Sequence, residues 1–304
     1  MSDHTDRPGD RPPLQFPLRG RHGSSRSSGR SFDATTYLES MAEGGTRADT
    51  VPTGFPSADA LLGGGLRRGD LVVLGGDIGS GKSALAMAFA VRAAARGASV
   101  GYLSGEMTVE RLTERALAME GRVTVDELRN GSLDDETHAS VAAASIRLRD
   151  RAPVFAHMAD TGVPGVSDFT VEHLGLELLV VDCLQSMATG ATILDEELAR
   201  ATRELKELAI RRGTTILLVS HMAIPPRGRP DPRPRLEDFG ALGAVRQHAD
   251  VLLAIFREEL YAPARDIEGA SELHVLKNRN GGVGYVDLYY YSKWLRFEDM
   301  VEPE

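Results

Sequence analysis

Residues 76–83, Gly-Asp-Ile-Gly-Ser-Gly-Lys-Ser, fit the pattern G-x-x-x-x-G-K-S/T between an apolar run and a segment of helical period. Glycines in such a loop let backbone N–H groups converge on phosphate oxygens, and the following helix N-terminus adds partial positive charge. The pattern predicts that Lys82 contacts the β- and γ-phosphates of ATP and that the Ser83 hydroxyl binds Mg²⁺. The expected nucleotide-binding residues are Gly76, Asp77, Ile78, Gly79, Ser80, Gly81, Lys82, Ser83 and Ala84.

Two acidic residues at the ends of apolar runs fit the same chemistry. Asp182 closes the run Leu-Leu-Val-Val, and an acid on a strand beside the glycine loop orders the magnesium ion. Glu106 follows the apolar segment 99–104, and the carboxyl edge of a parallel sheet would bring its carboxylate towards the phosphates. We expect Asp182 to bind the metal rather than act as a turn residue. Glu106 either polarises the attacking water or is an ordinary surface glutamate.

Two cations near the C-terminus could act on the γ-phosphate. Lys277 and Arg279 stand two residues apart at a predicted strand end, directly before a glycine turn. Phosphoryl transfer requires positive charge on the γ-phosphate in the transition state, and another subunit often supplies it. Strand alternation points both side chains the same way. The residues alone leave a second interpretation open, a charged hairpin tip without a catalytic role.

The segment 223–235 contains four arginines and one aspartate among five prolines, so it cannot be helical. Such a loop could bind a phosphate backbone or extend into solvent. His221, just before it, could sense the γ-phosphate or cap the sheet edge. The possible DNA contacts are Arg227, Arg229, Arg233 and Arg235.

Composition narrows the classes of protein. The formal net charge of −9 argues against a generally basic, nucleic-acid-coating surface, although nucleic acid can still bind at a few loops. The single cysteine, Cys183, excludes an internal disulfide and a cysteine metal cluster and fits a reducing compartment. No run approaches the roughly 18 to 20 apolar residues of a membrane span, and the N-terminus lacks the apolar block of a secretory signal. We therefore expect a cytoplasmic protein with no membrane partner.

From residue 71 onward, strand-length apolar runs alternate with segments of helical period, which indicates an α/β fold with a mostly parallel central sheet flanked by helices. The pattern also predicts that Thr108 caps one helix, that Thr124 and Glu127 form a capping box, and that Gly213 ends another helix. A C-terminal β-hairpin is expected around residues 278–282. The predicted strands cover residues 71–75, 99–104, 176–182, 214–220, 250–256, 272–277 and 285–291, and the clearest helices 82–95 and about 194–211.

The chain divides into three predicted parts. Residues 1–32 are rich in Pro, Gly, Ser and Arg without a hydrophobic period, so we expect a disordered basic tail. Residues 33–50 contain a short amphipathic stretch that is too small to bury itself and is expected to be a linker or docking helix. Residues 51–301 should form one domain. The basic tail could hold nucleic acid or simply be solvated.

These motifs together resemble the C-terminal, RecA-like ATPase domain of DnaB-type replicative helicases over most of residues 47–298. The resemblance implies a P-loop NTPase that assembles as a ring homo-oligomer, a hexamer, with ATP held between subunits. It implies that Glu106 is the catalytic base and Asp182 the magnesium-ordering acid. Lys277 and Arg279 would reach the γ-phosphate of the next subunit. The segments that carry it are TGFPSADALLGGGLRRGDLVVLGG, GDIGSGKS, YLSGEM, VVDCLQSM, TRELKELA, ADVLLAIFREELY and KNRNGGVGYVDL, in that order.

Several departures from the family pattern concern its DNA-binding side. The family has an Arg-Glu pair that is associated with DNA binding, and this chain has Gly240-Ala241 at that position. The family also has a Gln directly after the strand at 214–220, where this chain has His221. The family's N-terminal collar, which contacts primase, does not fit into some 50 residues before the ATPase domain. RadA-type recombination ATPases, which share LGGGL, GGD, SGE and KNR, are the second resemblance, without their zinc ribbon or protease-like domain.

Two functions therefore remain open from the sequence. The first is an ATP-dependent DnaB-like helicase that moves single-stranded DNA through a central channel, with a loader or another replication protein as a further partner. The second is a regulatory or scaffold ATPase, RadA-like or directed at a protein partner, that does not unwind DNA. The substitution at residues 240–241 favours the second, whereas the arginine-rich loop favours the first.

Overall fold

The computed structural model describes residues 34–35, 38–39, 49–158, 162–222, 229–261 and 267–300. The chain divides into two compact units, Met1–Gly45 and Thr46–Glu304. In the first unit, residues 34–35 and 38–39 are helical and lie within the predicted linker helix. The predicted tail, residues 1–32, lies outside the described residues. The second unit contains the predicted domain of residues 51–301.

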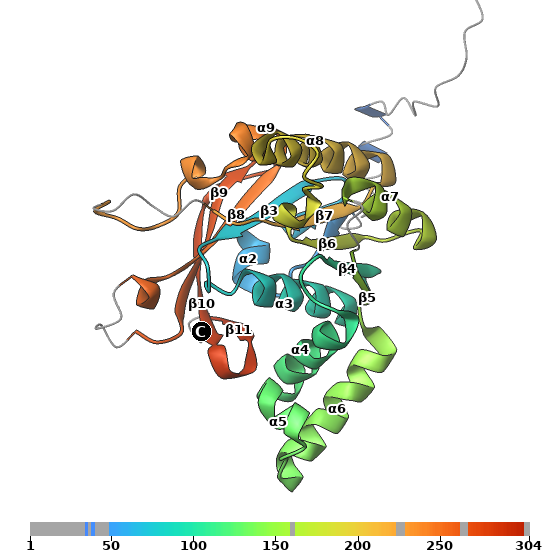
Figure 1. Ribbon diagram of the computed structural model, residues 1–304, viewed down its shortest axis with the longest axis vertical. Coiled ribbons are helices and arrows are strands. Elements are labelled where there is room, and N and C mark those ends of the chain that lie inside the picture. Colours follow the sequence, from blue (N-terminus) through green and yellow to red (C-terminus); the bar gives the residue numbers. More distant parts are fainter. Residues whose placement is uncertain are drawn as a thin grey trace, which may run out of the picture. The chain divides into compact units, whose positions relative to one another are not determined.

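A large sheet forms the centre of the second unit, and among the described residues it has nine strands in the order β11-β10-β9-β8-β3-β7-β6-β4-β5 (Figure 1). The pairings from β8 through β5 are parallel, whereas β9, β10 and β11 are antiparallel to their neighbours. The strands are β3 Leu71–Gly76, β4 Val100–Ser104, β5 Val154–His157, β6 Leu178–Asp182, β7 Thr215–Val219, β8 Val251–Arg257, β9 Ala270–Asn278, β10 Gly284–Tyr291 and β11 Arg296–Asp299.

Helices cover both faces of this sheet. On one face lie α2, α3 and α4, with α5 and α6 beyond them, and on the other lie α7, α8 and α9 (Figure 1). A separate small sheet pairs β1 Thr50–Val51 with β2 Leu66–Arg67. The helices are α2 Pro56–Leu61, α3 Lys82–Ala95, α4 Val109–Gly121, α5 Val125–Asn130, α6 Asp135–Arg151, α7 Gly162–Glu172, α8 Leu194–Arg212 and α9 Ala244–His248.

Alternate residues of the central strand face opposite hydrophobic cores. Val72 and Leu74 pack in the core that contains α3, whereas Leu71 and Val73 pack in the core that contains α8. All four are fully buried, as a strand covered on both faces requires. The predicted α/β fold with a mostly parallel sheet and a C-terminal hairpin is thus confirmed, with strand ends shifted by one or two residues.

Local signals in the sequence set several helix ends. The Thr108 side chain accepts a hydrogen bond from the Arg111 N–H at the start of α4. Thr124 and Glu127 form the predicted capping box of α5. Gly213 ends α8 in the left-handed conformation, with φ of 62°. Within the described residues, none of the helices is both long and apolar enough to cross a bilayer.

Candidate nucleotide-binding and catalytic site

The glycine-rich loop lies between β3 and α3, at the carboxyl edge of the parallel strands. Gly79 and Gly81 have φ of 76° and 96°, a region that disfavours residues with a side chain. A Cβ at Gly76 would come within 2.6 Å of Ser80 Oγ and 2.7 Å of an Ile255 methyl carbon. The loop therefore needs glycine at these positions, and the backbone can approach a phosphate closely where Gly79 leaves open space.

Lys82 is the first residue of α3 and is buried below the loop. Its Nζ donates a hydrogen bond to the Asp77 carbonyl oxygen at 2.8 Å, and burial lowers the pKa of its ammonium group. The nearby Ser80 Oγ is buried and makes no hydrogen bond within the described part of the chain. A buried ammonium and an unsatisfied buried hydroxyl suit a bound phosphate, whose oxygens would accept from both.

Asp182 ends β6 between β4 and β7, at the position that the sequence predicts. Its carboxylate is buried, and Tyr102 Oη donates to Oδ2 at 2.7 Å. Burial raises the pKa of Asp182, while hydrogen bonds from Tyr102 and Ser83 act in the opposite direction. Ser83 and Asp182 therefore stand together as oxygen donors, the type that Mg²⁺ prefers.

Glu106 follows β4 and lies beside the same edge. Its side chain is 51% exposed, so water can reach the carboxylate. Ser104 Oγ accepts hydrogen bonds from the backbone N–H groups of Glu106 and Met107, which fixes the turn after the strand. The structure thus brings the glycine loop, Lys82, Asp182 and Glu106 to one edge of the sheet.

The structure places two further side chains against Glu106. His221 Nε2 lies 3.9 Å from Glu106 Oε1, and the His221 backbone N–H donates to Gln185 Oε1. The Cys183 thiol donates to Glu106 Oε1 at 3.3 Å. Cys183 is buried, and burial raises the pKa of its thiol to about 11. Cys183 was not among the site residues predicted from the sequence, although its position one residue beyond Asp182 indicates the same end of the parallel strands.

Lys277 and Arg279 lie at the opposite edge of the sheet. Because β9 is antiparallel to β8, its end meets the beginning of β8 near Asp250. Lys277 Nζ donates to the carbonyl oxygens of Arg246 and Ala249 at 2.7 and 2.5 Å. Arg279 forms an ion pair with Asp250 at 2.9 Å. The two cations are thus away from the glycine loop of their own chain, and their action on a neighbouring subunit stays a prediction.

The predicted DNA contacts of the arginine-rich loop are partly engaged inside the chain. Arg227 lies outside the described residues. Arg229 is nearly buried and donates to both carboxylate oxygens of Asp238. Arg233 forms two hydrogen bonds with Glu272, whereas Arg235 is exposed. Asp238 and Glu272 thus neutralise the charges of Arg229 and Arg233, and DNA binding by the loop stays a prediction.

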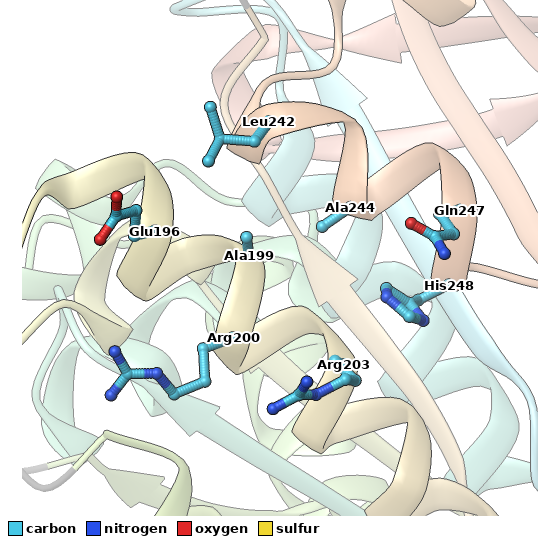
Figure 2. A pocket seen from close by; sticks show the side chains of 8 residues that line it. All are labelled: Glu196, Ala199, Arg200, Arg203, Leu242, Ala244, Gln247 and His248. Carbon is cyan, nitrogen blue, oxygen red and sulfur yellow. The ribbon is translucent and has the colours of Figure 1, made fainter.

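A pocket of about 410 Å³ lies between α8 and the segment that runs from Leu242 into α9. Figure 2 shows Arg200 and Arg203 on α8 opposite Leu242 and His248. Leu242 is 71% exposed, and its φ of 53° is unusual for a residue with a side chain. The pocket walls are formed by Glu196, Ala199, Arg200, Arg203, Leu242, Ala244, Gln247 and His248.

A parallel α/β sheet with a glycine-rich loop before α3 and an acid at the end of β6 defines a P-loop nucleotide-binding protein of RecA-like fold. The sequence matches the family described as DnaB-like helicase C terminal domain over residues 50–299, and the chain belongs to this family.

Two curated relatives of known name are consistent with membership of this family. The replicative DNA helicase DnaB of Leifsonia xyli subsp. xyli is 30% identical over 257 residues, which cover 82% of this chain and 56% of the relative. The replicative DNA helicase DnaC of Bacillus subtilis (strain 168) is 27% identical over 260 residues, with the same coverage of 82% and 56%. The chain therefore spans little more than half the length of these curated relatives.

Two solved structures show the same fold. One, described as an ATPase domain, superposes with a TM-score of 0.81 at 21% identity and covers 88% of this chain and 98% of its own. The other is a DnaB-like replicative helicase studied with its primase interactions, with a TM-score of 0.80 at 21% identity, covering 88% of this chain and 66% of its own.

Proposed function

We propose that this chain is an ATP-dependent DnaB-like helicase subunit that hydrolyses ATP at the interfaces of a ring and moves single-stranded DNA through the centre. The main support for this proposal is that the proposed catalytic groups lie at opposite ends of the parallel strands. The glycine loop, Asp182 and Glu106 meet at the carboxyl edge, whereas Lys277 and Arg279 lie at the opposite one. One subunit can then bind the nucleotide while its neighbour supplies the cations.

In this mechanism the glycine loop and Lys82 would hold the phosphates, and Ser83 and Asp182 would hold Mg²⁺. Bound Mg²⁺ would neutralise negative charge on the β- and γ-phosphate oxygens. Glu106 orients a water molecule and accepts its proton as the water oxygen attacks the γ-phosphorus and the bond to ADP breaks. The exposure of Glu106 is compatible with this role, because water can reach its carboxylate.

The neighbouring subunit completes the site. Arg279 would stabilise the negative charge that develops on the γ-phosphate, and Lys277 would support it. A closed ring of identical subunits gives every site the same neighbour, and six is the number that the resemblance implies. The proposed partners are therefore further copies of this chain, single-stranded DNA and a loader or another replication protein. A role in DNA replication would place the complex in the cytoplasm.

A second function, a regulatory or scaffold ATPase that does not unwind DNA, has two specific observations in its favour. Gly240 and Ala241 provide no charged side chain where the family grips DNA, and Arg229 and Arg233 are paired within the chain. Exposed Arg200 and Arg203 in the nearby pocket support the motor, because they could contact a phosphate backbone instead. Family membership favours the DnaB-like function over the RadA-like one.

ATP turnover with and without DNA separates the two functions. We expect a single strand of about 50 nucleotides to raise the turnover of the full chain and to be retained at low salt. A matched strand annealed into duplex serves as the control for non-specific charge effects. If the single strand neither stimulates turnover nor binds in low salt, the motor is excluded and the scaffold function remains.

A further inference from the structure

Three metal-ligating side chains meet beside the proposed catalytic site. Ser104, Asp182 and Val219 are aligned across β4, β6 and β7. Glu106 follows Ser104 by two residues, Cys183 follows Asp182 by one, and His221 follows Val219 by two. The sheet register therefore sets a carboxylate, a thiol and an imidazole side by side, each from a different strand end.

The distances fit a single transition-metal ion. Glu106 Oε1 lies 3.3 Å from Cys183 Sγ and 3.9 Å from His221 Nε2, and the three ligand atoms all lie within 4.8 Å of one another. Tetrahedral zinc with bonds of about 2.0 to 2.3 Å holds its ligand atoms roughly 3.3 to 3.7 Å apart. The exposed side chains of Glu106 and His221 need move only slightly to reach this geometry around the fixed Cys183 sulfur.

The neighbouring groups would orient these ligands. Ser186 Oγ lies 3.6 Å from Cys183 Sγ, and Gln185 Oε1 accepts a hydrogen bond from the backbone N–H of His221. Such contacts around a site hold the ligands in place. One end of the cluster is open to solvent, because Glu106 and His221 are 51% and 46% exposed, so an ion can enter and a water molecule can take the fourth position.

We propose that Glu106, Cys183 and His221 form a binding site for Zn²⁺ or a similar transition-metal ion, separate from the Mg²⁺ site. Sulfur and imidazole ligands select such ions over Mg²⁺, which prefers the oxygen donors of Ser83 and Asp182. Binding replaces the thiol proton, which passes to solvent, with a sulfur–metal bond. The occupied site would also withdraw the Glu106 carboxylate from the attacking water, a consequence that rests on the proposed function of Glu106.

Cobalt provides the direct test, because a thiolate bound to Co²⁺ gives an absorption band in the near ultraviolet. The chain has one cysteine, so this band can only come from Cys183. We expect the full chain to bind one Co²⁺ with this band and to release it when Zn²⁺ is added. Cys183→Ser should lose the band, and His221→Gln should weaken Zn²⁺ binding at least about tenfold in competition with a chromophoric chelator. The matched control is His138→Gln, which changes an exposed histidine on α6 and should bind as the unaltered chain does.

Turnover provides a second, separable readout. With Mg²⁺ in excess, micromolar Zn²⁺ should inhibit the unaltered chain and should inhibit Cys183→Ser much less, each relative to its own rate without zinc. Because zinc bound to ATP affects both proteins equally, the comparison cancels that effect. Absence of the cobalt band in the intact chain, or equal zinc binding by His221→Gln, overturns the metal site while leaving the proposed function intact. A band without inhibition supports the metal site and overturns the role of Glu106 as base.

Discussion

Lys82 is the residue on which nucleotide binding most depends. It is buried below the glycine loop and is the first residue of α3. We expect Lys82→Ala to abolish ATP hydrolysis and to weaken nucleotide binding, because the β- and γ-phosphates lose their charge partner. The measurements are steady-state turnover and titration with a fluorescent ATP analogue. Retained turnover in a correctly folded variant would contradict the assignment of the loop.

Glu106 and Asp182 should respond differently to neutralisation. Glu106→Gln keeps the size of the side chain but removes the proton acceptor, so we expect ATP to bind normally while turnover falls by at least about 10². Asp182→Asn should raise the Mg²⁺ concentration that half-maximal turnover requires, because it removes the buried charge beside Ser83 and so weakens Mg²⁺ binding. Magnesium titrations of both variants distinguish the roles, and an unchanged magnesium requirement in Asp182→Asn would contradict the assignment of Asp182.

At the scale of elements, the start of α8 depends on one buried carboxylate. Glu197 accepts hydrogen bonds from the backbone N–H groups of Thr192 and Thr189 at 2.5 Å each and of Gly190 at 3.2 Å. These bonds lower its pKa to about 2. A carboxylate with a depressed pKa stabilises the fold above its unfolded pKa of about 4.3, and this contribution disappears as the pH falls through 2.

The corresponding prediction concerns Glu197→Gln. We expect the variant to unfold at lower urea concentration than the unaltered chain at pH 7, and the gap between the two midpoints to narrow as the pH falls from about 4.5 towards 2. Urea unfolding at several pH values measures the gap. Glu196→Gln, which neutralises the preceding and exposed residue of the same helix, is the control. A gap that stays constant down to pH 2.5 would contradict the role of the Glu197 charge.

The exposed arginines of α8 provide a test of DNA binding at the same scale. Arg200→Glu and Arg203→Glu reverse charge in the pocket beside Gly240 and Ala241, so each should weaken retention of single-stranded DNA. Arg211→Glu, near the C-terminus of the same helix, is the matched control. Filter binding across a range of salt concentrations measures the effect. Equal loss in all three variants would show that the pocket has no special role.

The parts of the fold with strong local signals were predictable from the sequence. Burial on both faces makes β3 and β6 continuous apolar runs, and the glycine loop requires backbone angles that only glycine adopts easily. The helix α6 was missed because its 17 residues bury only Ala144 and Leu148, so its apolar period is weak. The strands β5 and β11 were also not predicted. Each has only four residues and is an outermost strand of the sheet, where burial is incomplete and the apolar pattern is therefore weak.

Within the site, the residues that directly follow the parallel strands were predictable, because the carboxyl ends of parallel strands meet at one end of the sheet. Contacts between distant segments were not predictable in this way. Arg233 binds Glu272 and Arg229 binds Asp238, so these pairs engage two of the four charges that the sequence offered as possible DNA contacts. The position of Cys183 against Glu106 could have been inferred from the strand ends, although no motif marks it.

At the scale of the whole molecule, the proposed mechanism requires two subunits for each catalytic site. In its own chain, Arg279 pairs with Asp250 at the edge opposite the glycine loop. We expect Arg279→Ala to lower turnover on the order of 10³-fold, the size associated with arginine fingers. Because the substitution also removes an ion pair, unfolding measurements should accompany it, and nucleotide binding should be nearly unchanged.

The most direct test mixes two inactive variants. Arg279→Ala subunits keep an intact glycine loop, and Lys82→Ala subunits keep an intact Arg279. If each site is shared between neighbours, mixed rings contain complete sites, so turnover should rise well above the sum of the two separate preparations and pass through a maximum as the ratio varies. Turnover that stays at that sum, in mixtures shown to contain both variants in one assembly, would contradict catalysis between subunits.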